Sequence, residues 1–273
     1  AAAAGIILTG GLGRIARVSQ ALVPAMALLY LGGGALVLLL RWPQVPQALS
    51  LIFRCAFTPQ AALGGGLGWT AAEALRHGVA RGVFTNEAGL GTSAMAHGAA
   101  EVDHPARQGM WGIFEVFFAT LLTCTLTALV ILVGGVYQPE TFLSQLRQGT
   151  LPDWALGVPL TARSFSAVLG EAGAWIVWIS LLLFAFSSIL GWSYYGQQSL
   201  RFLTGEDRLL PLYRAVFLGC VVLGACGNSA GLWQLVDLCN ALMAIPNLLA
   251  LLLLAPQALR LLQQWVQQQN APV

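Results

Sequence analysis

The sequence predicts an all-α membrane protein, and three observations predict it. Hydrophobic residues make up 57% of the 273 residues and charged residues only 9%, whereas a soluble globular domain carries about 25% charged residues. The mean hydropathy is +0.73. Several apolar stretches approach or exceed the roughly 20 residues that a transmembrane helix needs. These values exclude a soluble enzyme, and a net charge of +2 is too small for a nucleic-acid-binding surface.

Six membrane spans are expected along the chain, at residues 18–40, 46–84, 112–136, 172–195, 212–227 and 232–255. All but the second are continuous apolar stretches, and the fifth is the shortest. The second span begins as an apolar stretch and then contains Pro59, Gly64 to Gly66 and Gly68. Proline removes a backbone donor and clustered glycines favour an opened backbone, so we expect a span that is broken near its middle. A re-entrant loop or a kink that only shapes packing is the alternative.

The arginines predict the orientation of the chain in the membrane. If the chain starts on the cytoplasmic side, nine of the thirteen arginines lie on that side and four on the other. This distribution agrees with the positive-inside rule. Six crossings then return the C-terminus to the cytoplasm. Residues 137–161 become an outside loop, long enough to fold over the protein as a lid.

Polar groups within the spans are the candidates for a binding site. Non-helical backbone at membrane depth is tolerated only where it faces protein or a water-filled cavity, so the break at residues 59–68 is one candidate. Ser187 and Ser188, together with Phe184 and main-chain carbonyls, could bind an alkali cation, because hard cations prefer oxygen ligands. Alternatively, each serine bonds a carbonyl of its own or a neighbouring helix. Trp192 could form the wall of a small cavity or anchor the helix at the membrane interface.

Ionisable groups inside spans are functional candidates by default. Glu115 and Asp237 could act in proton or cation coupling, or each could bond to a neighbouring helix. The histidines at positions 97 and 104 lack metal-ligand spacing, and we interpret their segment as a solvated loop. No catalytic group and no organic cofactor is expected, and no metal ion other than the alkali cation.

Five segments resemble the alanine or glycine:cation symporter family, the sodium:alanine symporters. The longest is RGVFTNEAGLGTS at residues 81–93, which is too long and specific for chance agreement. The other four are residues 56–65, 124–132, 191–196 and 237–247. Two positions depart from the pattern expected of the family: Ala119 stands where we expect Asp, and Gln197 stands where Glu is common. Both departures bear on ion coupling.

The resemblance implies an amino-acid transporter fold built from two inverted five-helix repeats. Residues 1–273 then form a single, N-terminally incomplete transporter domain that contains about core helices five to ten, one of them broken mid-membrane. The expected partners are the lipid bilayer, a small neutral amino acid and a missing N-terminal half, without which the chain is not expected to transport. The expected location is the plasma membrane, which in bacteria is the inner membrane.

The implied function is sodium-coupled import of alanine or glycine. The expected substrate-binding residues are Phe57, Thr58, Gly64, Gly65, Gly66 and Trp192, where bulky neighbours leave room only for a small side chain. The expected sodium-binding residues are Ser187, Ser188 and Phe184. Asn86, Glu87, Gly89 and Asp237 are expected to act in gating. The alternatives are a proton-coupled carrier of another small solute and a non-transporting membrane subunit or sensor.

Overall fold

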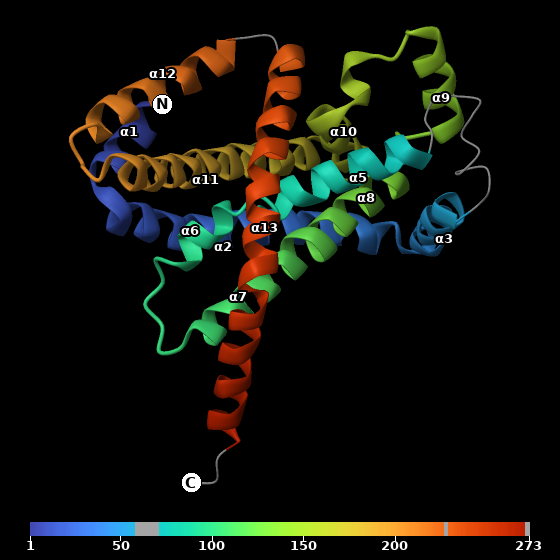
Figure 1. Ribbon diagram of the computed structural model, residues 1–273. Coiled ribbons are helices and arrows are strands. Elements are labelled where there is room, and N and C mark those ends of the chain that lie inside the picture. Colours follow the sequence, from blue (N-terminus) through green and yellow to red (C-terminus); the bar gives the residue numbers. More distant parts are fainter. Residues whose placement is uncertain (58–70, 227–228, 271–273) are drawn as a thin grey trace. The chain divides into compact units, whose positions relative to one another are not determined.

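The computed structural model describes residues 1–57, 71–226 and 229–270, and all regular elements in these ranges are helical (Figure 1). The elements are α1 (Ala2–Thr9), α2 (Gly11–Leu40), η1 (Trp42–Gln44), α3 (Val45–Phe57), α5 (Ala71–Asn86), α6 (Thr92–His97), α7 (Pro105–Val116), η2 (Phe117–Thr123), α8 (Cys124–Val133), α9 (Pro139–Gln148), η3 (Asp153–Ala155), α10 (Gly157–Leu169), α11 (Glu171–Thr204), α12 (Leu210–Cys226) and α13 (Ser229–Gln269). The predicted all-α class is confirmed.

Four helical segments are long and apolar enough to cross a membrane. They are Gly11–Leu40, Pro105–Val133, Glu171–Thr204 and Leu235–Gln269. The expected spans at 18–40, 112–136, 172–195 and 232–255 overlap these segments, and the expected fifth span overlaps the shorter apolar helix α12. The expected break at residues 59–68 lies outside the described residues. A multi-pass membrane protein is therefore supported by helix length and composition.

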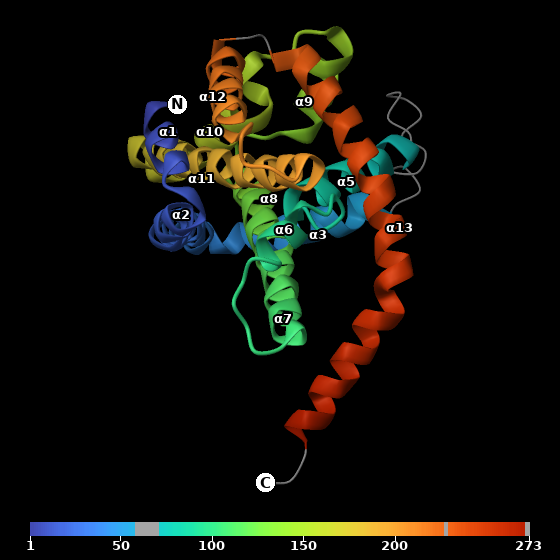
Figure 2. The same ribbon diagram turned by 60° about the vertical axis from the view of Figure 1, so that its left-hand side comes forward.

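Helix α13 is the longest element, with 41 residues that include Pro246 and Pro256. Figure 2 shows that it remains one helix and bends along its length. Proline inside a helix removes a backbone hydrogen bond and commonly bends it.

The expected outside loop at residues 137–161 contains α9, η3 and the start of α10. Aromatic contacts hold it together: the ring centroids of Tyr137 and Phe142 are 4.8 Å apart, and those of Phe142 and Trp154 are 6.1 Å apart. The guanidinium of Arg163 lies 4.3 Å from the Trp154 ring centroid, a cation–π geometry. These contacts between side chains offset part of the conformational entropy that the loop loses when it becomes ordered.

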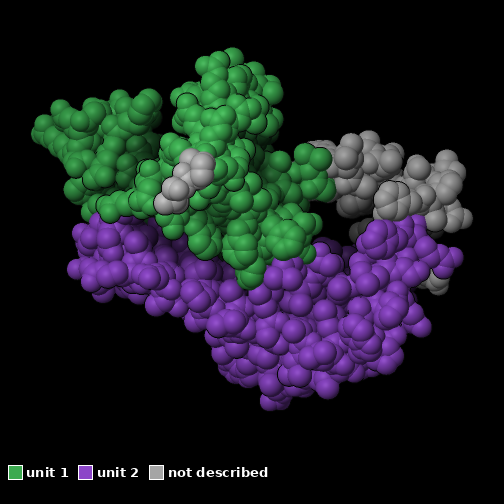
Figure 3. Space-filling view, turned by 90° about the horizontal axis from the view of Figure 1, so that it is seen from below, with its two compact units in different colours: residues 1, 77–121, 193–273 green, residues 2–76, 122–192 purple. Residues whose placement is uncertain are grey.

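The chain divides into two compact units, drawn in different colours in Figure 3. The Tyr30 unit contains residues 2–76 and 122–192, and the Glu87 unit contains residue 1, residues 77–121 and residues 193–273. Each unit is described by itself.

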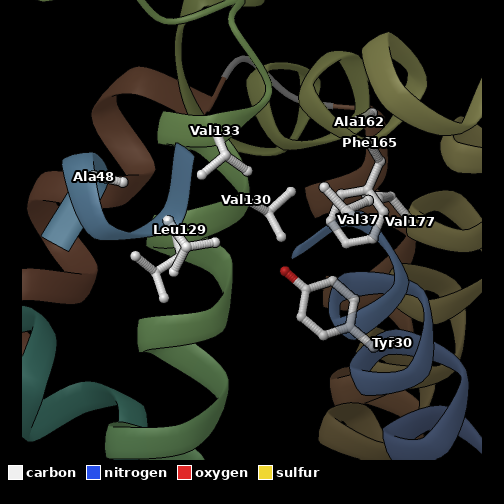
Figure 4. Packing of buried hydrophobic residues seen from close by; sticks show 10 residues of the cluster. Tyr30, Val37, Ala48, Leu129, Val130, Val133, Ala162, Phe165 and Val177 are labelled. Atoms are coloured by element: carbon white, nitrogen blue, oxygen red, sulfur yellow. The ribbon is translucent and has the colours of Figure 1, made fainter. Parts of the chain in front are cut away.

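The core of the Tyr30 unit forms where α2, α3, α8 and α10 pack together. Val37, Val130 and Phe165 are fully buried in it, and Figure 4 shows them with the Tyr30 ring. The Tyr30 hydroxyl lies 2.7 Å from the Thr127 hydroxyl, so its polar end has a partner on α8. A side chain at Gly34 would collide with Leu126. This small residue therefore allows α2 and α8 to approach closely, as is usual for helices in membranes.

In the Glu87 unit, α7 packs against α6 and α13. The chain leaves α5 at Asn86 and enters α6 at Thr92, so a short turn joins these two helices beside α13.

Candidate functional site

The candidate site is built around residues 86–91, which we call the 86–91 turn. Glu87 follows the last residue of α5 and has a φ of 57°, a left-handed conformation that is uncommon for residues other than glycine. Its carbonyl accepts hydrogen bonds from the amides of Leu90 and Gly91, at 3.0 and 3.1 Å. Gly91 has a φ of 82° and directly precedes α6. The expected gating segment is thus a tight turn with two left-handed residues.

Side chains of the turn bond to both flanking helices. Asn86 donates to the Gly82 carbonyl at 3.0 Å and accepts from the Ala88 amide at 3.1 Å, which closes the turn locally. Its amide nitrogen also lies 3.5 Å from the Thr120 hydroxyl. Thr92, which is buried, donates its hydroxyl proton to the Glu87 carboxylate at 3.0 Å. These bonds join the turn to α5, η2 and α6.

Helix α13 contributes two further contacts. Arg81 on α5 forms an ion pair with Asp237 at 3.1 Å, and Asn247 donates to the carbonyls of Ala88 and Gly89, at 2.9 Å each. The four residues expected to act in gating all belong to the Glu87 unit. Asp237 of α13 thus pairs with Arg81 of α5, and Gly89 in the turn accepts from Asn247 of α13.

A cavity of about 160 Å³ adjoins the turn, large enough for several water molecules. Its walls are Thr85, Asn86, Glu87, Ser93, Ala96, His97, Glu115, Ala119 and Tyr195. The Tyr195 side chain hydrogen-bonds Glu87. Ala119 lies in η2, a π-helical stretch between α7 and α8, and π-helical segments are frequent at functional sites. Two carboxylates, an imidazole and hydroxyl groups thus surround one small polar space.

The structure corrects our interpretation of His97. We expected a solvated loop, but His97 ends α6 and its side chain is only 27% exposed. Its ring bridges Gln108, at 2.8 Å, and the Glu115 carboxylate, at 3.3 Å. Glu115 and Asp237 therefore each pair with a side chain of a neighbouring helix. No group of three or more metal-ligating side chains occurs among the described residues.

The expected sodium-binding residues lie in the Tyr30 unit. The Ser187 hydroxyl is 2.9 Å from the Phe184 carbonyl and 3.8 Å from the Met26 sulfur. Ser188 is exposed. The Phe184 ring meets Tyr30 edge to face, with centroids 6.2 Å apart.

The substrate-binding candidates are mostly outside the described residues. This applies to Thr58, Gly64, Gly65 and Gly66 and to the side chain of Phe57. Trp192 is described and is half-buried in α11.

Three residues of this region were not among the expected site residues, although each lies in a segment that resembles the family: Arg81, Asn247 and Tyr195. Arg81 and Asp237 are separated by 156 positions, and Asn247 and Gly89 by 158. No local periodicity links residues that far apart. The signals for Asn247 were its polarity within an apolar span and its place at the end of the segment 237–247.

Comparisons with known proteins identify the family. The model of the sodium:alanine symporter family matches residues 1–272. An uncharacterized transporter of Haemophilus influenzae is 41% identical over 91% of the chain and 52% of its own length. The sodium/alanine symporter AgcS of Methanococcus maripaludis is 37% identical over 91% of the chain and 51% of its own length. A putative sodium/proton-dependent alanine carrier, YrbD of Bacillus subtilis, is 32% identical over 97% of the chain and 55% of its own length.

The chain spans about half the length of the curated relatives it matches. The family match concerns residues 1–272 of this chain and gives no support to the expected partner, a missing N-terminal half.

The matched family and the named relative are symporters and not enzymes. This agrees with the prediction that the protein is not an enzyme. The chain belongs to the sodium:alanine symporter family.

Proposed function

We propose that the protein is a sodium-coupled secondary symporter that imports a small neutral amino acid, alanine or glycine. The observation that carries this proposal is the family match over residues 1–272, together with a relative named as a sodium/alanine symporter at 37% identity. The described apolar helices give the chain the lipid-facing surface that such a carrier needs.

In this proposal, the amino acid binds at Trp192 and at the second span, which the sequence predicts to be broken. Opened backbone offers amide donors and carbonyl acceptors for the charged ends of a zwitterion. Phe57, Thr58 and Gly64 to Gly66 supply the remaining surface.

One sodium ion binds at Ser187, Ser188 and Phe184. The Ser187 hydroxyl is 2.9 Å from the Phe184 carbonyl, and a hydroxyl that donates its proton keeps lone pairs for a cation. The contact within the helix is therefore compatible with ligation.

Gating belongs to Asn86, Glu87, Gly89 and Asp237. The strained backbone at Glu87 supports this role, because strained residues cluster at switch regions. The protein operates in the bacterial inner membrane with its C-terminus in the cytoplasm, as the arginine distribution suggests.

Uptake of labelled alanine into proteoliposomes that contain the protein tests the proposal. An inward sodium gradient should drive accumulation, glycine should compete, and replacement of sodium by potassium should abolish uptake. Uptake that persists without sodium under an imposed proton gradient would instead support the proton-coupled carrier. This is the second candidate because YrbD is named as a putative sodium/proton-dependent alanine carrier. Binding without any uptake would point to a sensor or a non-transporting subunit.

Substrate preference needs a separate competition series, because one relative, GlnT of Bacillus subtilis, is named as a probable sodium/glutamine symporter at 34% identity. Stronger competition by glutamine than by glycine would contradict the small-substrate proposal.

A further inference from the structure

Asn247 of α13 makes a contact with the 86–91 turn that the gating proposal leaves unused. Its side-chain amide donates to two successive carbonyls, those of Ala88 and Gly89, at 2.9 Å each. A carboxamide carries two donor hydrogens, so both are used on the turn. Since an unpaired amide or carbonyl within an apolar span is costly, these two bonds favour one fixed position of the turn on α13.

The opposite side of the Asn247 carboxamide is enclosed by Gly91. A Cβ atom at Gly91 would lie 2.6 Å from the Asn247 side-chain oxygen and 2.9 Å from its Cγ. Gly91 also has a φ of 82°, where side chains with a Cβ are disfavoured. Thus the glycine satisfies both the turn geometry and the space for Asn247.

The turn needs an external support because its backbone is strained. Glu87 has a φ of 57°, and such conformations persist only where surrounding contacts determine them. The second contact from α13, the ion pair of Arg81 with Asp237, is 43% and 45% exposed at its two side chains. Exposed ion pairs contribute little to stability. The hydrogen bonds of Asn247 are therefore the stronger contact between α13 and the turn.

We propose that Asn247 is a positioning residue that couples the 86–91 turn to α13, so that a displacement of α13 moves or releases the turn. This inference rests on the proposed gating role of Asn86, Glu87 and Gly89. Because Asn247 bonds the turn and not the proposed substrate residues, its loss should change the rate of turnover and leave substrate affinity intact.

The test compares the unmodified protein with Asn247→Asp, Gly91→Ala and the matched control Asn240→Asp. The carboxylate of Asn247→Asp cannot donate, and it faces two carbonyls. Gly91→Ala displaces the Asn247 side chain without removing it. Asn240 lies about two turns earlier on the same helix, and no side-chain hydrogen bond of Asn240 is found among the described residues. All four proteins are reconstituted in nanodiscs, and amide hydrogen exchange of residues 86–91 is followed by mass spectrometry.

Loss of two hydrogen bonds should raise exchange of the turn about tenfold or more in Asn247→Asp, with a similar rise in Gly91→Ala and no change in Asn240→Asp. In proteoliposomes, the maximal uptake rate of Asn247→Asp should fall while the equilibrium Kd for alanine stays within about twofold. Unchanged exchange in Asn247→Asp, or an equal rise in the Asn240→Asp control, overturns the inference. A weakened Kd also overturns it, because it assigns Asn247 to the substrate site.

The exchange measurement separates this inference from the proposed function. If the unmodified protein shows no sodium-driven uptake, the proposed function fails, while exchange still decides whether Asn247 holds the turn. If uptake is present and exchange in the variants is unchanged, only the inference fails.

Discussion

At the scale of single residues, Glu87 combines a strained backbone with a bonded carboxylate. Its φ of 57° places it in the left-handed region, which costs L-residues about 1–2 kcal/mol. The carboxylate accepts from Thr92 at 3.0 Å and is bonded by Tyr195. The side-chain bonds thus help to hold a conformation that the backbone alone disfavours.

We predict that Glu87→Gln slows turnover and leaves alanine affinity nearly intact. The amide keeps the shape and one acceptor oxygen but loses the charge, which weakens the bonds from Thr92 and Tyr195. Initial uptake rates and equilibrium binding measure the two quantities separately. A large loss of binding affinity would place Glu87 in the substrate pocket and contradict the gating role.

A second residue-scale prediction concerns the cation. Replacement of both Ser187 and Ser188 by alanine should raise the sodium concentration for half-maximal uptake, because two oxygen ligands are lost. The matched control is Ser199→Ala. The native Ser199 hydroxyl donates to the Tyr195 carbonyl of the same helix at 3.0 Å. An unchanged sodium dependence in the double variant would remove both serines from the proposed site.

At the scale of elements, one buried side chain joins α11 to α12. Gln197 is 5% exposed and accepts two hydrogen bonds from the Arg214 guanidinium, at 2.9 and 2.8 Å. Its amide donates back to the Ser193 carbonyl at 3.1 Å. Gln197 stands where we expected Glu, so Arg214 of this chain bonds a neutral acceptor and not a carboxylate.

We predict that Gln197→Leu destabilises the protein by about 2 kcal/mol, because hydrogen bonds to a charged group contribute about 1.5–3 kcal/mol. Gln197→Glu should retain or increase stability, since it keeps the acceptor and adds an opposite charge. Thermal unfolding in detergent of the two variants and the unmodified protein measures the difference. Equal melting temperatures for the leucine and glutamate variants would show that the Arg214 contact is not stabilising.

The positions of the long helices along the chain can be predicted from hydropathy, but the contacts between helices cannot. The apolar stretches at 18–40 and 172–195 overlap helices that were found, because hydrophobic length is a local property. The π-helical stretch that contains Ala119, a residue of the cavity wall, was not predicted, since it has no distinct local sequence pattern.

At the scale of the whole molecule, the arginine distribution predicts orientation. We expect Val102→Cys, in the segment between α6 and α7, to be labelled from the cytoplasmic side, and Ser144→Cys on α9 from the outside. Both native residues are exposed. A membrane-impermeant maleimide applied to right-side-out and inside-out vesicles makes the measurement, in a background with the five native cysteines replaced by serine. Labelling of both positions from one side would contradict the alternating topology.

The sequence by itself determined the helical membrane class, the family resemblance and the segment at residues 81–93 as the most specific one. Composition and hydropathy suffice for the first, because lipid leaves a spanning chain few backbone options. Only the tertiary structure decided that Asn247 bonds Gly89, that Arg81 pairs with Asp237, and that Glu115 meets His97 at the cavity. These contacts join residues of different elements, and their formation depends on how those elements pack, which no local pattern encodes.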